Sequence, residues 1–156
     1  MSVPHRDTPF YVRRRDGFRM SVYLPPMTAT PLYRELIDTF GNAWQAADID
    51  RLVSVFTPDA VFVETPFSRK DVGIGAIRAY WQDLPTTQAE VSFRSGEIFE
   101  VGPWFATEFR CTFRRRRNGE WVDARGAIFC ETKDGKISEM RMYWHRYAGG
   151  KEEPKP

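Results

Sequence analysis

The second half of the chain, from residue 88 to residue 147, alternates apolar and polar residues, and this period-two pattern is typical of half-buried β-strands. Turn sequences interrupt it at Gly102-Pro103, Asn118-Gly119 and Asp134-Gly135, and the last two are strong signals for tight hairpins. Four strands are therefore predicted, over residues 88–101, 104–116, 120–132 and 136–147. Because each is joined to the next by a short turn, they should form an antiparallel meander.

Helical patterns come before the meander. Apolar residues between positions 31 and 47 recur at three- and four-residue spacing, which describes one face of a helix. Asp48 can cap a short second helix, a strand follows at 60–65, and a third helix is predicted over 74–84 with Pro85 as its stop. Helices first and a long meander afterwards predict an α+β fold, with the helices packed on one face of a curved sheet.

The composition fits one soluble domain. A chain of 156 residues is long enough for one domain with a proper core and too short for two of ordinary size. Hydrophobic residues at 42% exclude global disorder, and no apolar run approaches the length that crosses a bilayer. No hydrophobic segment of a secretory signal follows the first residues, which favours a cytoplasmic location. The net charge of +2 gives no reason to expect nucleic acid as a partner.

The folded body is expected to start near Met27, because two prolines end whatever precedes it. Residues 1–26 form a separable basic arm. This arm could be a small hairpin around the Asp16-Gly17 turn signal, a disordered tail, or a stretch translated ahead of a true start. Residues 27–148 make up the domain, and residues 149–156 are predicted to be a disordered tail.

The two cysteines, Cys111 and Cys130, lie inside apolar strand-like runs rather than in a metal-binding pair. Free, buried thiols are therefore predicted. The sequence contains no motif for a metal, a nucleotide or a nucleophilic triad, so no cofactor is expected.

Four segments together resemble the SnoaL-like branch of the nuclear transport factor 2-like superfamily. They are FGNAWQAADIDRLVSVF, TPDAVFVETPF, VGIGAIRAYW and DGKISEMRMYWHR, and the resemblance spans residues 33–147. It implies a cone-shaped barrel, in which three N-terminal helices pack against a strongly curved mixed or antiparallel sheet around a cavity. It also implies a homodimer formed through the outer face of the sheet. Members differ in activity, so the fold alone does not choose the function.

Ketosteroid isomerases of this superfamily offer the sharpest comparison. Their general base precedes the proline of the first strand, where this chain has Thr65, and threonine cannot shuttle a proton near neutral pH. Their oxyanion-stabilising tyrosine falls on Phe40, and the acid that assists it falls on Ala127. The resemblance therefore argues against a ketosteroid isomerase mechanism, which needs a base and a preorganised oxyanion hole.

The same alignment assigns a face to each strand, because side chains alternate sides along a strand. Val61, Val63 and Thr65 are expected to look into the cavity, which turns Phe62 and Glu64 away and makes Glu64 a non-catalytic residue. On the last strand the expected inward set is Met140, Met142 and Trp144, and the expected outward set is Glu139, Arg141, Tyr143 and His145.

Asp123 and Arg125 are the candidate catalytic residues. They share one strand face with Ala127, the position aligned to an inward acid, so they should point toward the cavity mouth. An Arg two residues from an Asp is similar to the arrangement of limonene epoxide hydrolases, where carboxylates activate water. The other interpretation is a cross-strand ion pair on the sheet surface. The run Arg114 to Arg117 could bind a phosphate-bearing ligand, but a solvated hairpin end is the favoured interpretation.

Large aromatic side chains are the strongest positive signal for a ligand cavity. The residues expected to line it are Phe40, Trp44, Val63, Thr65, Trp81, Ala127, Phe129, Met140, Met142 and Trp144. The favoured hypothesis is a ligand-binding or dimerisation module for a small apolar molecule. The alternative is a cofactor-independent lyase, isomerase, cyclase or epoxide-hydrolase-like enzyme that uses Arg125 and Asp123. The sequence leaves open whether the protein is an enzyme.

Overall fold

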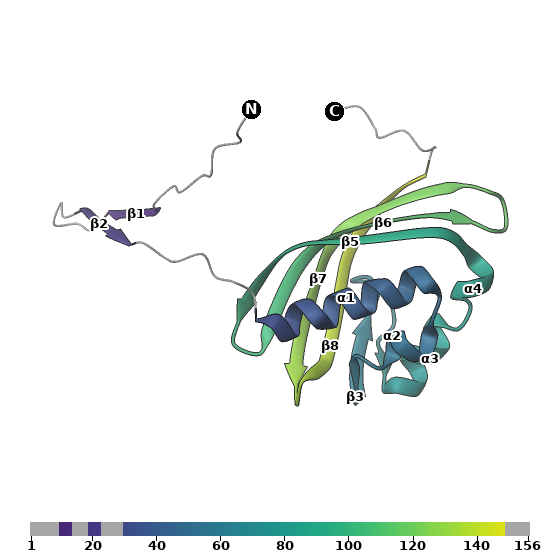
Figure 1. The fold of residues 1–156 in the computed structure, drawn as a ribbon, viewed down its shortest axis with the longest axis horizontal. Helices are drawn as coiled ribbons and strands as arrows, with labels where there is room; N and C mark the ends of the chain where they lie inside the picture. Colours follow the sequence, from purple (N-terminus) through teal and green to yellow (C-terminus); the bar gives the residue numbers. More distant parts are fainter. Residues whose placement is uncertain (1–9, 14–18, 23–29, 149–156) are drawn as a thin grey trace.

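A computed structural model of the protein describes residues 10–13, 19–22 and 30–148 (Figure 1). The helices are α1 (Pro31–Ala46), α2 (Ile49–Val53), α3 (Ile74–Trp81) and α4 (Leu84–Thr87). The main sheet contains β3 (Phe56–Val63), β4 (Asp71–Val72), β5 (Gln88–Val101), β6 (Trp104–Arg115), β7 (Trp121–Lys133) and β8 (Lys136–Ala148). None of the helices in this part of the chain is long and apolar enough to cross a membrane.

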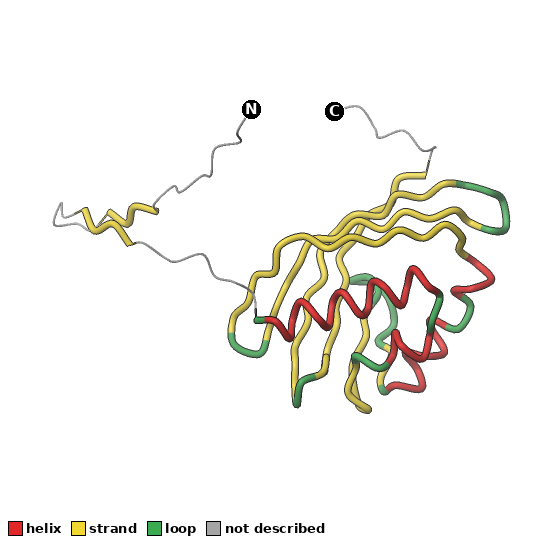
Figure 2. The backbone as a smooth tube through the Cα atoms, in the orientation of Figure 1, coloured by secondary structure: helices red, strands yellow, loops and turns green. Residues whose placement is uncertain are grey.

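The main sheet has six strands in the order β4-β3-β8-β7-β6-β5. β3 runs parallel to β8, and every other neighbouring pair is antiparallel, so the sheet is mixed. The long strands β5 to β8 bend over α1 (Figure 2). Two register shifts in β5, between Ala89 and Ser92 and between Ser95 and Ile98, fall in this bent region, as expected for bulges that increase curvature.

Helix α1 forms because its apolar residues share one face and because proline is well tolerated in a first helical turn. It ends where Ala47 adopts a left-handed conformation, with φ of 53°. The Asp48 side chain then accepts a hydrogen bond of 3.0 Å from the Arg51 amide and so begins α2. The buried face of α1 lies against β5, on the concave side of the sheet (Figure 1).

The core occupies the space between the helices and the concave face. Its largest side chains with almost no exposed surface are Phe40, Phe56, Phe62, Phe105, Ile37, Leu52, Ile77, Ile128, Ile137 and Met140. Phe105, Phe109 and Cys111 of β6 belong to it, as the alternation in that strand predicts. Cys111 and Cys130 are free and buried, which confirms the prediction of unpaired thiols.

The α+β class and the four long strands are confirmed, but the helix order needs correction. Only α1 and α2 precede the first strand of the main sheet, whereas α3 and α4 follow it. Pro85 does not simply stop a helix, because it occupies the first turn of the short helix α4. The polar turn before α3 contains β4, a two-residue strand that pairs with β3 through Val61 and Phe62.

The predicted arm contains a two-stranded antiparallel sheet. In it β1 (Phe10–Arg13) pairs with β2 (Arg19–Val22). The rest of residues 1–26, and the predicted tail at 149–156, lie outside the described residues.

Candidate functional site

Aromatic rings converge between the helices and the concave face of the sheet, as the sequence predicts for Phe40, Trp44 and Trp81. Phe129 was expected among them, but it lies on the outer face and is 43% exposed. Phe40 of α1 is fully buried and stands edge-on to four neighbouring rings, with centroid distances of 5.9 Å to Trp44, 6.3 Å to Phe56, 5.7 Å to Trp81 and 6.1 Å to Phe93. Met140 and Met142 also belong to the same buried cluster. We call this set the aromatic cluster: Phe40, Trp44, Phe56, Trp81, Phe93, Met140 and Met142. Its rings fill the interior by direct packing.

The three tryptophans near the cluster differ in their hydrogen bonding. Trp44 Nε1 donates to Gln88 Oε1 at 3.0 Å, and Trp144 Nε1 donates to the Glu64 carbonyl oxygen at 3.0 Å. Trp81 Nε1 is buried and has no partner among the described residues, a condition that it shares only with Thr57 Oγ1 there. A buried donor without an acceptor is unusual and points to a group that the protein itself does not supply.

The predicted facing of β3 is wrong. Phe62 is fully buried and lies opposite Met140, whereas Val61 and Val63 lie opposite Glu139 and Arg141. Phe62 therefore looks inward, and Val63 lies on the outer face, away from the aromatic cluster. Val63 is nevertheless only 9% exposed, so this strand is covered on both sides. An apolar run that is buried on both faces carries no alternation from which its facing can be read.

A polar hollow of about 340 Å³ lies between the end of β3, β4 and α3. Its lining includes Glu64, Ser68, Arg69, Asp71, Ala76, Ala79 and Tyr80. Tyr80 donates a hydrogen bond to the Glu64 side chain, and Arg69 Nη2 lies 3.2 Å from Asp71 Oδ1. Burial, followed by the negative charge of Glu64, holds the pKa of Tyr80 well above its usual range, so this hydroxyl remains a donor.

Thr65 stands beside this hollow rather than in the aromatic cluster. Its Oγ1 lies 2.7 Å from Ser68 Oγ, in the turn that follows β3. The sequence missed the polar hollow because it assigned Glu64 to the face away from the cavity. The signal that could have found it is the position of Tyr80, one residue before the buried Trp81 on α3.

Asp123 and Arg125 lie on the outer face of β7, so the expectation that they point into the cavity is wrong. The buried side of β7 is formed by the residues of the opposite parity, which are Val122, Ala124, Ile128 and Cys130. That apolar set was visible in the sequence. The expectation failed because it took its facing from the position aligned to Ala127, which also lies on the outer face, opposite Glu108 and Tyr143.

The outer-face carboxylate binds two guanidinium groups. Arg110 donates from Nε and Nη2 to the two oxygens of Asp123, at 3.1 and 3.0 Å, and Arg125 Nη2 donates to Asp123 Oδ2 at 2.7 Å. Asp123 is only 6% exposed because these two side chains cover it. Its hydrogen bond from Arg125, together with those from Arg110 and both positive charges, lowers its pKa despite burial.

The outer face also carries exposed apolar side chains on four neighbouring strands. Phe99, Ala106 and Phe129 stand opposite one another, and Val101 stands opposite Trp104. The Phe129 and Tyr143 rings meet edge-on, with centroids 5.6 Å apart. We call Phe99, Val101, Trp104, Ala106, Phe129 and Tyr143 the apolar stripe. It borders two hollows of about 800 and 330 Å³ that share Trp104 and Phe129.

The last strand follows its predicted facing. Met140 and Met142 are buried, Trp144 packs against the core, and Arg141, Tyr143 and His145 are exposed on the outer face. Within the described residues, no group of three or more His, Cys, Asp or Glu side chains could hold a metal ion.

The chain and its structure were compared with known proteins. No protein with a curated description matches the chain in sequence. A protein from Bacillus subtilis, assigned provisionally as an isomerase, is 21% identical with a TM-score of 0.66, and the match covers 74% of this chain and 90% of that one. A protein with a ketosteroid isomerase-like fold from Catenulispora acidiphila, solved with trimethylamine, is 16% identical with a TM-score of 0.65, over 74% and 86% of the two chains.

The epoxide hydrolase/cyclase-like enzyme SalBIII, from pyran ring formation in the polyether salinomycin, is 23% identical with a TM-score of 0.63, over 72% and 89% of the two chains. At such identities these likenesses concern the fold. The profile of the SnoaL-like domain, by contrast, matches residues 37–140, which is more than half of the sequence. This chain therefore belongs to the SnoaL-like domain family.

Proposed function

We propose that this protein is a binding module for a small, mostly apolar molecule that enters the aromatic cluster and accepts a hydrogen bond from Trp81 Nε1. The observation that carries the proposal is this donor, which is buried and has no acceptor among the described residues. Leaving such a group unsatisfied costs about 1–3 kcal/mol. A carbonyl or ether oxygen of a ligand would accept this hydrogen bond and recover that free energy. The apolar part of the ligand would pack against the rings and so replace the contacts that the rings now make with one another.

The surroundings of Trp81 suit such a ligand. Phe40, Trp44 and Phe62 supply aromatic surface within 6 Å between ring centroids, and the nearby Met140 has a flexible side chain that can repack. Two relatives of the same fold support the idea of a small ligand, because one was solved with trimethylamine and another, TerC, with polyporic acid. The interior is filled by side chains, so binding requires these rings to move.

The test compares two probes that differ in one acceptor, acetophenone and ethylbenzene. We expect wild-type protein to bind acetophenone about tenfold more tightly, since one hydrogen bond to a buried donor contributes about 1 kcal/mol or somewhat more. Trp81→Phe should remove that preference. Affinities are measured by two-dimensional NMR titration.

Trp44→Phe is the matched control. It also replaces a buried indole of the cluster, but its N–H already donates to Gln88, so the preference for acetophenone should remain. Equal affinity of wild-type protein for the two probes would show that water satisfies Trp81 Nε1 and would overturn the proposal.

We also infer that the protein is a homodimer assembled through the apolar stripe. Four of its side chains are widely exposed, at 64% for Phe99, 82% for Val101, 43% for Phe129 and 42% for Tyr143. A contiguous apolar surface of this kind on a soluble domain marks an interaction site. A two-fold axis near Phe129 would place the stripe of one chain on the same stripe of its partner, which is the simplest way to cover it.

A further inference from the structure

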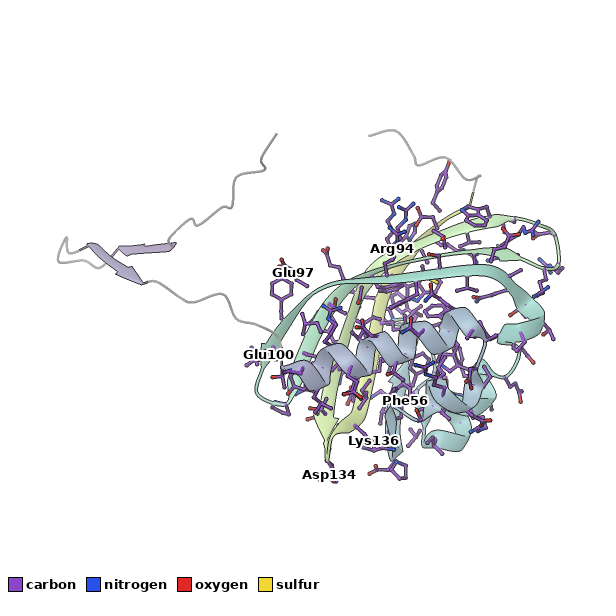
Figure 3. The ribbon with its side chains drawn as sticks, in the orientation of Figure 1. Phe56, Arg94, Glu97, Glu100, Asp134 and Lys136 are labelled. Carbon is purple, nitrogen blue, oxygen red and sulfur yellow. The ribbon has the colours of Figure 1, made fainter. Side chains whose placement is uncertain are left out.

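The polar hollow between the end of β3, β4 and α3 shares no lining residue with the aromatic cluster. β3 begins at Phe56, which packs against Phe40 of α1 inside the core (Figure 3). The hollow adjoins the opposite end of that strand, where Glu64 follows its last residue. The polar side chains that line it are Glu64, Ser68, Arg69, Asp71 and Tyr80. This end of the strand therefore meets a second space with a different chemistry.

Asp71 is a buried carboxylate with little compensation for its charge. The residue is only 8% exposed, and its Oδ1 accepts one hydrogen bond, of 3.2 Å, from Arg69 Nη2. The side chain of Arg69 is 87% exposed, so solvent screens its charge. The other oxygen of Asp71, Oδ2, accepts no hydrogen bond from any of the described residues. Because removing a carboxylate from water is costly unless donors surround it, this oxygen points to a donor that the protein does not supply.

Glu64 is the second carboxylate of the hollow, and none of the described arginines or lysines pairs with it. Its side chain accepts a hydrogen bond from the neutral hydroxyl of Tyr80. Burial, and then the negative charges of Glu64 and Asp71, raise the pKa of Tyr80, so both carboxylates lie close to its hydroxyl oxygen. Two carboxylates and one guanidinium leave the lining with a net charge of −1. A recess with this charge attracts a cation.

We propose that the polar hollow binds a primary ammonium group carried on a small apolar body. An ammonium has three N–H donors, and the acceptors for them are the Glu64 carboxylate, Asp71 Oδ2 and the lone pairs of the Tyr80 hydroxyl oxygen. The volume of about 340 Å³ leaves room for the body of the ligand against Ala76 and Ala79 of α3. A metal ion fits less well, since the described residues contain no group of three or more metal-binding side chains.

The experiment is a two-dimensional NMR titration at neutral pH with three probes: benzylamine, which is protonated there, benzyltrimethylammonium and benzyl alcohol. We expect saturable binding of benzylamine that weakens with added salt, and at least tenfold weaker binding of the uncharged alcohol. Benzyltrimethylammonium should also bind more weakly than benzylamine, because it carries the charge without an N–H donor. The amide signals that shift should come from residues 64–71 and 76–80.

Glu64→Gln removes one charge and keeps an amide oxygen that can accept from Tyr80, so it should fold normally and weaken benzylamine at least tenfold. Asp71→Asn should weaken it as well. Glu139→Gln is the matched control, since Glu139 is a carboxylate on the neighbouring strand β8 that pairs with Arg141 instead. It should leave the affinity for benzylamine unchanged.

The proposal does not depend on ligand binding at Trp81. A probe that entered the aromatic cluster would have to leave its charge unsolvated, so binding there would favour benzyl alcohol over benzylamine. The proposal is overturned if benzylamine does not saturate, if benzyl alcohol binds as tightly as benzylamine or more tightly, or if Glu64→Gln and Glu139→Gln lower the affinity equally.

Discussion

At the scale of single residues, Asp123 is the clearest case of a side chain whose stabilising contribution depends on its charge. It is covered by Arg110 and Arg125, and its lowered pKa means that the folded state favours the carboxylate. Both arginines are partly exposed, at 42% and 50% of their side-chain surface, so solvent screens the interaction. The carboxylate also separates two guanidinium groups that would otherwise repel each other.

Asp123→Asn should lower the free energy of unfolding by about 1–2 kcal/mol at neutral pH, because it removes charge-assisted hydrogen bonds and exposes the arginine repulsion. The pKa of Asp123 is depressed in the folded state, so its contribution is present above the unfolded pKa of about 4 and is lost as pH falls through the lower folded value. Urea denaturation should therefore show the gap between wild type and variant narrowing with acid. A gap that stays constant down to about pH 2 would show that the carboxylate charge is not its source.

Asp123 and Arg125 also show how far sequence reasoning reaches at this scale. Their proximity was predictable, since residues two apart share a strand face. Their side of the sheet was not predicted, because the facing was taken from one aligned position instead of from the buried set around Ile128. The unpartnered Trp81 Nε1 could not be predicted at all, since it depends on which acceptors the packed interior brings near it.

At the scale of elements, the long strands were predictable because turn sequences separate them and alternation continues between the turns. β4 was not, since a two-residue strand carries no periodicity. The packing of α1 on β5 depends on a detail that periodicity does not reveal. Gly41 lies on the buried face of α1, where an added Cβ would stand 2.2 Å from Phe93 Cδ1.

Gly41→Ala should destabilise the protein although alanine is the better helix former by about 1 kcal/mol. The methyl group would collide with the Phe93 ring, which is itself held between Phe40, Trp44 and Phe109, so it cannot move freely. Overpacking of this kind costs about 1–3 kcal/mol, and we expect a net loss in the free energy of unfolding by chemical denaturation.

The matched control is Gly75→Ala in α3. No atom lies within 4 Å of the added Cβ there, and the residue is exposed. It should stabilise the protein by about 0.5–1 kcal/mol through reduced flexibility of the unfolded chain. If both substitutions stabilise the protein, α1 does not press on β5 at Gly41.

At the scale of the whole molecule, the two faces of the sheet differ in kind. The inner face packs against the helices and forms the filled core, whereas the outer face carries the apolar stripe and, on the same strands, the ion pairs of Arg110, Asp123 and Arg125. The resemblance to a family predicted the cone and its sheet. It could not predict how completely the rings fill the interior, because that depends on the joint packing of Phe40, Trp81 and Phe93 rather than on any one residue.

The division of the outer face leads to a prediction about assembly. Phe99 is 64% exposed within the apolar stripe, and a specific dimer interface covers about 800 Å² on each partner. Phe99→Asp would place a charge in that surface on both chains, and burying this charge in an apolar interface is unfavourable. We expect wild-type protein to sediment as a dimer and Phe99→Asp to sediment as a monomer with an unchanged circular dichroism spectrum.

Phe67→Asp provides the comparison, because Phe67 is fully exposed in the turn after β3 and lies outside the apolar stripe. It introduces the same charge and removes the same ring, so a dimer that uses the stripe should survive it. Phe67 is 100% exposed and Phe99 is 64% exposed, so Phe67→Asp removes the larger apolar surface. A general effect of surface hydrophobicity would therefore weaken association at least as much in Phe67→Asp as in Phe99→Asp. A wild-type protein that sediments as a monomer, or a dimer lost equally in both variants, would rule out the stripe as the interface.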